Sequence, residues 1–429
     1  MIEINCLIRK TIMRRLALCY TVWNLIVILG ISFLFHGASF AGAPVHGSKA
    51  AGMGTAFVGL ADDPSAIMHN PAGLTQLKGT NTYGGGTVVI PSTEYISPTG
   101  QSEETDSRLF FPPHFYISSD FNMENVVLGL GIFSPFGIGG RYWSEQGLTR
   151  YISTESTIAT ITVNPTLAWQ VTPKLSVGLG VYYLYSDNTA EKMLNQSMFG
   201  APDGKFSLDA DGGGWGYNLG ILFAPIEKLH FGFAFRSKVS VDQKGDAEIE
   251  NIAPALRPLF GGSQFKTDVE TSVTLPEIVS FGIAWKPANR LTLAFDVEWV
   301  RWSRFNQQTI DFTNEVPAAG FSDISVDLDW NDQWLIKFGL EYYLNESFAL
   351  RTGYAFVETP VPERTLSPAN PDGDGHNFSI GFGYKFGKWI VDAFYTVEIF
   401  KNRDVNNDIL SGEYKNITHF IGFSIGNKF

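Results

Sequence analysis

Apolar and polar residues alternate along most of this chain. In residues 231–241, most odd positions from Phe231 to Val241 fall on one face of an extended backbone, whereas Arg236 and Lys238 fall on the other. Side chains of a strand point alternately to opposite faces, so this pattern predicts a strand with one apolar and one polar face. The same pattern recurs in residues 291–299 and 389–399.

The composition of the two faces indicates a membrane barrel. The polar faces carry glycines beside charged residues, the apolar faces are rich in aromatic residues, and the chain holds 44 Gly, 34 Phe, 16 Tyr and 10 Trp. A mean hydropathy of +0.01 is too polar for a helical membrane protein, but it suits a barrel in which every second residue meets lipid. We therefore expect an all-β fold, a transmembrane antiparallel β-barrel with lipid outside and a polar lumen.

Fourteen strands are expected from about residue 80 onward, and an even number is typical of closed bacterial barrels. Short turns such as 172–174 and 386–388 alternate with long connections such as 187–212 and 247–266, as they do at the periplasmic and exterior ends of such barrels. The expected strands are 80–96, 108–121, 125–140, 156–173, 175–188, 213–226, 228–246, 267–286, 290–310, 332–344, 347–358, 376–387, 389–402 and 413–429.

Residues 1–41 are expected to be a secretory signal. A basic start precedes an apolar stretch that ends near Phe35, and small residues at Ser39 and Ala41 suit a signal peptidase. The stretch is long enough to span a bilayer, so an uncleaved anchor is the alternative. Both cysteines, Cys6 and Cys19, lie in this segment. A secreted chain of amphipathic strands is expected in the Gram-negative cell outer membrane as an integral, multi-pass protein.

Residues 42–79 differ from the rest of the chain. Residues 47–57 are small and Gly-rich, and residues 61–73 are predicted to be helical with an end set by proline. This segment is too short to build its own core. We expect it to be a hatch packed inside the lumen, with residues 80–429 forming the barrel.

The last strand places Ile421, Phe423 and Phe429 on one face. A terminal aromatic strand of this kind is the signal that such barrels present to the barrel-assembly machinery. We therefore expect this machinery, outer-membrane lipid and lipopolysaccharide as partners of a monomeric barrel.

Charge and motifs argue against several classes of function. A formal net charge of −12 argues against nucleic acid. The seven histidines show no metal-ligand spacing, and the chain has no Gly-x-Ser-x-Gly nucleophile motif. Neither Gly84–Gly86 nor Gly212–Gly214 is followed by the Lys-Ser/Thr of a phosphate loop. We expect neither an enzyme nor a bound metal or cofactor.

The end of the third strand is the first candidate for a functional feature. Ser134, Pro135, Phe136 and Gly137 resist regular pairing, because proline lacks the N–H donor and glycine marks bends. We expect the wall to bend or open here. The alternative is an ordinary strand end that runs into a loop.

Two exterior connections carry apolar side chains, which favours a hydrophobic groove or loop helices packed on each other. The alternative is that each loop closes over a small core of its own. The candidate ligand-binding residues are Met193, Leu194, Met198 and Phe199 in one loop, and Ile252, Leu256, Leu259 and Phe260 in the other.

Charged residues of both signs are expected in the lumen, where most should pair with one another. A buried arginine makes a good partner for a ligand carboxylate, and Arg351 and Arg364 are the candidates for that role. The expected lumen set is Arg236, Lys238, Asp296, Glu298, Lys337, Glu341, Arg351, Asp392 and Glu398.

Several stretches resemble the FadL-type family of outer-membrane transporters for long-chain fatty acids, which also includes channels for toluene and related aromatic hydrocarbons. They run in order across essentially the whole predicted mature chain. They are residues 47–73, 134–137, 214–222, 235–237, 275–276, 302–305, 350–356 and 360–362.

The resemblance implies a hatch, an inward kink in the third strand that opens the wall laterally, a low-affinity groove between the third and fourth exterior loops, and a higher-affinity pocket inside. The two apolar loops are the third and fourth by count. Asn70, Pro71 and Ala72 match the hatch motif, and Pro135 lies at the kink.

The predicted function is transport of hydrophobic compounds across the outer membrane, with long-chain fatty acids as the first choice of ligand. It would proceed by capture on the exterior loops, rearrangement of the hatch and lateral diffusion through the gap. Aromatic hydrocarbons are the alternative ligands, because the carboxylate-binding cations of the family are not all matched. A polar porin and a structural or adhesive barrel are the alternatives of other classes.

Overall fold

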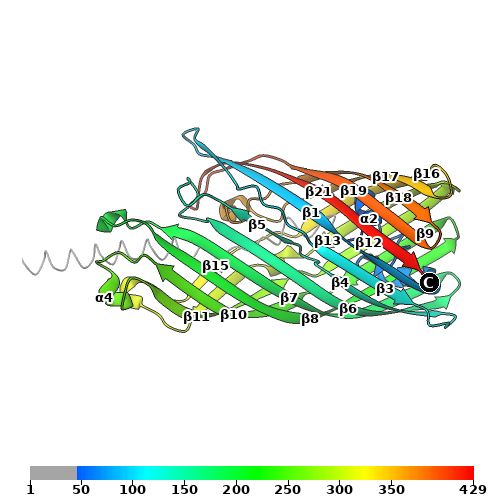
Figure 1. Ribbon diagram of the computed structural model, residues 1–429, viewed down its shortest axis with the longest axis horizontal. Coiled ribbons are helices and arrows are strands. Elements are labelled where there is room, and N and C mark those ends of the chain that lie inside the picture. The colour runs from blue at the N-terminus through cyan, green and yellow to red at the C-terminus, as the bar shows by residue number, and fades with distance from the viewer. Residues whose placement is uncertain (1–45) are drawn as a thin grey trace, which may run out of the picture.

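The computed structural model describes residues 46–429, and they form a closed antiparallel barrel of fourteen strands (Figure 1). The predicted signal segment 1–41, with its cleavage site and cysteines, lies outside these residues. No helix within residues 46–429 is long and apolar enough to cross a membrane.

Eight of the fourteen barrel strands are continuous, and five are divided into two by a break. The remaining strand, second in chain order, is β3, which the short β2 precedes. The continuous strands are β1 (Thr80–Ile96), β6 (Glu155–Thr172), β7 (Leu175–Leu194), β8 (Gly204–Ile226), β17 (Phe348–Val357), β18 (Gly375–Phe386), β19 (Trp389–Phe400) and β21 (Gly412–Lys428). The second is β3 (Pro113–Ser119) with β2 (Ser102–Glu104), and β20 (Arg403–Val405) adds to the exterior end of β21. The divided strands are β4 (Val126–Phe133) with β5 (Ile138–Tyr142), β9 (Leu229–Arg236) with β10 (Val239–Glu250), β11 (Phe265–Leu275) with β12 (Ile278–Ala288), β13 (Leu291–Val300) with β14 (Gln307–Phe312), and β15 (Ile324–Asp327) with β16 (Gln333–Tyr343).

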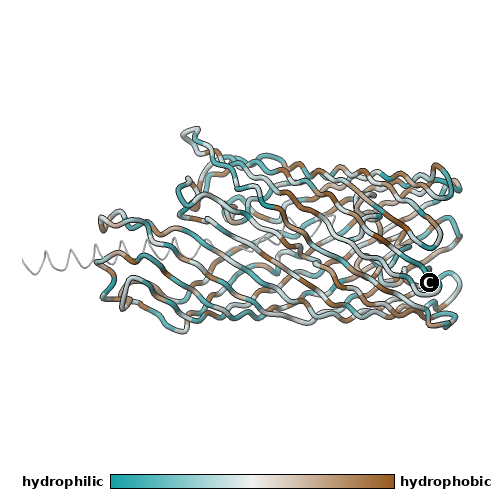
Figure 2. The backbone as a smooth tube through the Cα atoms, viewed as in Figure 1, coloured by the Kyte–Doolittle hydropathy of each residue, from teal (hydrophilic) through white to brown (hydrophobic). Residues whose placement is uncertain are grey.

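The first and last strands close the barrel. β1 pairs with β21 from Asn81 opposite Lys428 to Ile96 opposite Glu413. The predicted number of strands and the antiparallel closure are confirmed. Apolar side chains cover the outside, and Figure 2 shows their alternation with polar residues along the strands. They include Phe233, Phe338, Ile380, Trp389 and Phe423.

The exterior ends of β7 and β8 are longer than the sequence pattern predicts. Residues 187–194 and 204–212 are strand, so the expected loop 187–212 shrinks to residues 195–203. The reason is a reversal of polarity. In this region Asp187 and Asp209 point outward and Leu208 points inward, so the apolar face has moved from the outside to the lumen. These strands project at the exterior end of the barrel together with β10 and β11 (Figure 1).

The faces predicted for residues 231–241 are wrong after Arg236, because a break separates β9 from β10. Arg236 is buried in the lumen as expected, but Val239 and Val241 are buried as well, and Lys238 is exposed. One irregular position shifts the alternation by one residue, so every later side chain changes face. The upper lumen is therefore apolar, and only its lower half is polar as predicted.

The hatch, residues 46–79, lies within the barrel near the end that carries the C-terminus (Figure 1). It contains α2 (Ser48–Gly52), α3 (Ala66–His69) and the 3-10 helix η2 (Pro71–Gln76). The predicted helix over 61–73 is thus two short turns, because Pro71 ends the first and begins the second.

A connection that was expected to be an exterior loop folds inward instead. Between β17 and β18, Val361, Leu366 and Ala369 are fully or almost fully buried, and Trp143 Nε1 donates a hydrogen bond to the Pro368 carbonyl (2.9 Å). This inserted loop contains η6 (Glu363–Thr365). The remaining short helices are η3 (Ser197–Phe199), α4 (Arg257–Phe260), η4 (Trp302–Arg304) and η5 (Pro317–Ala319).

Candidate functional site

Buried polar side chains hold the hatch against the wall. The Asp296 carboxylate on β13 accepts hydrogen bonds from the backbone N–H groups of Phe57 (2.6 Å) and Val58 (2.8 Å). Asn70 donates to the carbonyls of Val58 (2.9 Å) and of Ile221 on β8 (3.0 Å). The Asn70 side chain therefore joins two parts of the hatch to the barrel.

Glycines of the wall let the hatch backbone approach closely. A Cβ on Gly353 of β17 would overlap the backbone of Gly54, and a Cβ on Gly282 of β12 would overlap Gly59. Glycine is the residue that permits such contact. The other wall glycines in contact with the hatch backbone are Gly178, Gly220, Gly232, Gly339 and Gly381.

Arg351, a predicted carboxylate-binding residue, lies in an ion network between the hatch and the wall. Its guanidinium pairs with Glu341 (2.8 Å) and Asp392 (2.6 Å), and Lys49 of the hatch pairs with Asp62 (2.8 Å) and Glu341 (3.6 Å). Two carboxylates already balance Arg351, as the expected pairing of lumen charges implies.

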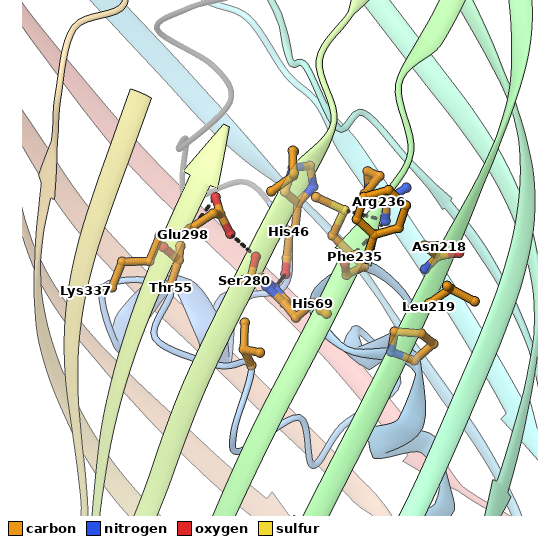
Figure 3. A pocket seen from close by; sticks show the side chains of 15 residues that line it. His46, Thr55, His69, Asn218, Leu219, Phe235, Arg236, Ser280, Glu298 and Lys337 are labelled. Atoms are coloured by element: carbon orange, nitrogen blue, oxygen red, sulfur yellow. Dashed lines mark hydrogen bonds and ion pairs between the residues drawn. The ribbon is translucent and has the colours of Figure 1, made fainter. Parts of the chain in front are cut away.

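A cavity of about 40 Å³ lies between the hatch and the wall strands β8, β9 and β12 (Figure 3). His46 and His69 line it from the hatch, and Asn218 and Arg236 from the wall. On its other side, Lys337 pairs with Glu298 (3.3 Å), so these two charges offset each other.

The two hatch histidines are neutral at physiological pH. Burial lowers the pKa of His69 to about 4. Burial also holds the pKa of His46 well below its ordinary value, with the neighbouring His69 adding to the effect. Uncharged imidazoles can donate or accept hydrogen bonds, but they supply no positive charge.

Arg236 is the cation of this cavity that has no carboxylate beside it within the described chain. Its side chain is buried, Nη2 lies 3.3 Å from the Met68 carbonyl, and Nη1 has no hydrogen-bond partner in the part of the chain that the structure describes. The guanidinium lies 5.5 Å from the ring centre of Phe133 and 4.8 Å from that of Tyr182. A buried guanidinium with free donors can bind an anion strongly.

The wall is interrupted directly beside this cavity. Phe133 ends β4 opposite Thr162, and Ile138 begins β5 opposite Ala159. Four residues of this strand, 134–137, thus face only two residues of β6. They form a tight turn in which the Gly137 N–H donates to the Ser134 carbonyl (3.0 Å).

The turn pushes the third strand into the lumen. Phe136 is buried, and its ring lies 6.3 Å from that of Trp302, which follows β13 on another part of the wall. On the side of β3, the ladder to β4 ends at Ile132, and within residues 46–429 no ladder joins the two strands above it. Ser134, Pro135, Phe136 and Gly137 therefore lie at a break in the wall that side chains fill.

The two apolar exterior loops contact each other. The Gln196 side chain accepts a hydrogen bond from Ala253 N–H (2.5 Å) and donates one to the Asn251 carbonyl (2.7 Å). Of the eight predicted loop residues, Leu194, Ile252 and Leu256 are buried in the apolar cluster of the upper lumen, and Phe199 and Phe260 pack against it. Met198 and Leu259 remain exposed. Met193 and Leu194 lie in β7 rather than in a loop, and Met193 is half-buried there.

Arg364 lies at the exterior surface, where its exposed side chain pairs with Asp329. Sequence reasoning placed Arg236 in the lumen but did not select it, because nothing in one sequence shows that it lacks a partner. It also missed the inserted loop, whose prolines and small residues read as an ordinary connection.

Comparisons with known proteins agree with this architecture. The model of the family described as outer membrane protein transport protein (OMPP1/FadL/TodX) matches residues 32–429. The chain is 27% identical over 418 residues to a putative outer membrane protein of Neisseria meningitidis, covering 85% of this chain and 88% of that one. It is 25% identical over 386 residues to a long-chain fatty acid transport protein of Escherichia coli, covering 81% and 84%.

Solved structures share the fold at low sequence identity. A Pseudomonas aeruginosa FadL homologue superposes with a TM-score of 0.80 at 18% identity, over 90% of this chain and 99% of that one. The Pseudomonas putida toluene transporter TodX superposes with a TM-score of 0.75 at 18% identity, over 91% and 99%. The chain belongs to the OMPP1/FadL/TodX family of outer membrane transport proteins and is an integral protein of the cell outer membrane.

Proposed function

We propose that this protein carries hydrophobic compounds from outside the cell into the outer membrane bilayer through the break at Ser134–Gly137. The observation that carries the proposal is the position of this break. Phe133 ends the strand just before it and also lies against Arg236 and His46 at the inner cavity. A gap in a lipid-facing wall leaves backbone groups without water, so it is costly unless something apolar passes through it.

The route begins on the exterior loops. Exposed Met198 and Leu259 offer a first apolar contact, and burial of ligand surface contributes about 25 cal/mol per Å². The ligand then passes through the apolar upper lumen to the cavity between the hatch and the wall. A small rearrangement at the start of the hatch, near His46, would widen that cavity and open the way past Phe133. No bond is made or broken on this route.

Long-chain fatty acids are the ligands that the inner cavity supports best. Arg236 offers a charged donor to a carboxylate, and Phe133 and Tyr182 border it with apolar surface. The E. coli relative is named a long-chain fatty acid transport protein, and TodX a toluene transporter. Toluene has no carboxylate or other hydrogen-bonding group for Arg236 to bind, which makes aromatic hydrocarbons the second candidates.

The test replaces residues 134–137 by the two residues Val-Thr, which would restore an even ladder between the third strand and β6. Cells without their own transporter would express the natural or the repaired protein, and uptake of radiolabelled oleate and toluene would be measured. We expect the repair to abolish uptake while the barrel still folds, as shown by heat-dependent gel migration.

The matched control is Phe136→Ala, which keeps the turn and removes only the side chain that touches Trp302. It should retain uptake. Uptake that survives the Val-Thr repair would exclude the lateral exit. A natural protein that admits neither ligand would favour a porin or a structural barrel.

A further inference from the structure

We infer that the upper lumen contains a second binding site, which takes an uncharged hydrogen-bonding group on a mostly apolar ligand. The inference rests on the transport route proposed above, because the site lies on that route. It adds a class of ligand, neutral amphiphiles, to the carboxylates that Arg236 would bind.

The site is a cavity of about 30 Å³ between β6, β7, β8, β10, β11 and β14. It is separate from the cavity between the hatch and the wall. On β8, Ala210 lines the upper cavity and Asn218 the lower one, and eight residues of strand span about 26 Å. A ligand that moves from the loops to the hatch would meet the upper cavity first.

Buried amides without partners line this cavity. Gln243 is 1% exposed, and neither its nitrogen nor its oxygen has a hydrogen-bond partner among residues 46–429. Gln308 is 4% exposed; its nitrogen donates to Thr271 Oγ1 (3.3 Å), but its oxygen is unpaired. Buried polar groups in proteins are nearly always paired, and an unpaired one is costly. Three unpaired atoms from two strands therefore indicate a binding site for a polar group of a ligand.

The strand register explains why these amides meet open space. Gln243 of β10 lies opposite Thr271 of β11 on one side and opposite Gly212 of β8 on the other. Because Gly212 has no side chain, its position on β8 offers nothing to cover the amide. Asn188 of β7 adds one more unpaired oxygen on the far side of this gap.

The lining defines the chemistry of the ligand. The residues around the cavity are amides, hydroxyls and apolar side chains, and none of them carries a charge. A carboxylate here would lose its hydration without a cation in return, which is unfavourable. An amide offers both a donor and an acceptor, so a hydroxyl, a carboxamide or an ester carbonyl is complementary to it. Leu208 and Ile310 provide apolar surface for the attached chain.

The size of the cavity suits one small polar group. A single water needs about 10–15 Å³ of such space, so the cavity can hold one or two waters or the head of a fatty alcohol. Water alone is therefore the competing explanation, and the test must separate it from a ligand.

The experiment compares radiolabelled 1-dodecanol with dodecane, which differ only in the hydroxyl group. Binding to the purified full-length protein in lipid nanodiscs is measured against empty nanodiscs, and uptake is measured in transporter-deficient cells. Gln243→Leu and Gln308→Leu each remove one amide at similar volume. Gln307→Leu is the matched control, because Gln307 precedes Gln308 on β14 but is exposed and bonds to Asp327.

We expect both lumen variants to weaken dodecanol binding by roughly tenfold, as expected for loss of a buried hydrogen bond, and to leave dodecane binding unchanged. Gln307→Leu should alter neither. If dodecanol binds equally well to the natural protein and to both variants, the amides hold only water and the inference is wrong. An equal loss of both ligands would also overturn it, because that indicates a damaged wall.

The two proposals fail in different ways. Uptake of dodecane and oleate by the natural protein, with no effect of the amide variants on dodecanol, leaves the transport function standing without the second site. A natural protein that admits none of the three ligands overturns the transport function, and this inference with it.

Discussion

Arg236 is the side chain on which the proposed ligand class depends. Its guanidinium is buried, Nη1 has no partner, and no carboxylate of the described chain lies within salt-bridge distance. Arg351, by contrast, already has Glu341 and Asp392. A charged hydrogen bond in a buried site is among the stronger polar contacts, so a ligand carboxylate would find its largest polar gain at Arg236.

Arg236→Gln should therefore lower oleate affinity by roughly ten- to a hundredfold, the range expected for loss of a charge-assisted hydrogen bond. Toluene affinity should not change. The oleate affinity of Arg236→Lys should lie between those of the natural protein and Arg236→Gln, because lysine keeps the charge but loses the planar fork. Binding of oleate and toluene to the purified natural protein and to both variants tests this, with exposed Arg304→Gln as the control. An equal loss for oleate and toluene would mean that Arg236 only supports the structure.

Buried titratable groups of the hatch make its docking depend on pH. Burial lowers the pKa of His69 to about 4 and that of His46 well below normal, so both contribute docking stability above pH 6.5 that is lost as the pH falls toward 4. Burial raises the pKa of Asp63 to about 6, so this group favours docking at acid pH and opposes the histidines.

His46 and His69 both favour docking at neutral pH, and Asp63 alone favours it at acid pH. Docking of the hatch should therefore be weaker at pH 4.5 than at pH 7. Ala66→Cys, at a fully buried position of the hatch, should react faster with a maleimide label after brief incubation at pH 4.5. Adding Asp63→Asn removes the opposing group and should enlarge the difference between the two pH values. Identical labelling at both pH values would show that docking does not depend on these groups.

Strands are the elements that the sequence predicts best, and their breaks are what it predicts worst. The alternation predicts the fourteen strands, and Pro135 with Gly137 predicts the irregular third strand, because both residue types act locally. The break after Arg236 is invisible, since one slipped position leaves the alternation intact on both sides. The alternation that starts at Phe231 therefore places Val239 and Val241 on the outer face, whereas they are buried in the lumen.

The candidate site is predictable only where one residue carries the signal. The charges of the lumen can be recognised from the alternation, but their pairing depends on register between distant strands. Gln243 meets Thr271 and Gly212 through two separate ladders, and no pattern within β10 reveals this. The inserted loop is hidden for the same reason, because its Pro368 carbonyl is held by Trp143, more than two hundred residues away.

The glycines that seat the hatch give a prediction about elements. Gly353→Val on β17 would place a side chain where the backbone of Gly54 lies, and backbone cannot give way as a flexible side chain can. The hatch should be displaced, so that Ala66→Cys becomes reactive at pH 7 and the cells become sensitive to bulky antibiotics. Gly262→Val, in an open exterior loop, is the control. A hatch that remains protected in Gly353→Val would refute the role of the glycines as its seat.

The whole molecule divides into three zones along the barrel: projecting exterior strands, an apolar upper lumen and a polar lower lumen that the hatch fills. The hatch backbone contacts seven wall strands at glycines, and Asp296, Asn70 and Lys49 add polar contacts. Removing it would break all of these contacts at once and expose buried charges to the lumen. Under the proposed route, a ligand would leave sideways through the break in the third strand, with movement only at the start of the hatch near His46 and the rest of the hatch in its seat.

This arrangement predicts that the hatch can be locked without loss of transport. Ser48 Oγ at the start of α2 lies 2.8 Å from Ser424 Oγ of β21, so Ser48→Cys with Ser424→Cys should form a disulfide that ties the hatch to the wall. Oleate uptake should be the same in oxidised and reduced cells and in the two single variants, because the proposed movement is confined to the start of the hatch near His46. Uptake that disappears on oxidation and returns with a reductant would show instead that the ligand passes where the hatch now lies, through the periplasmic end of the barrel.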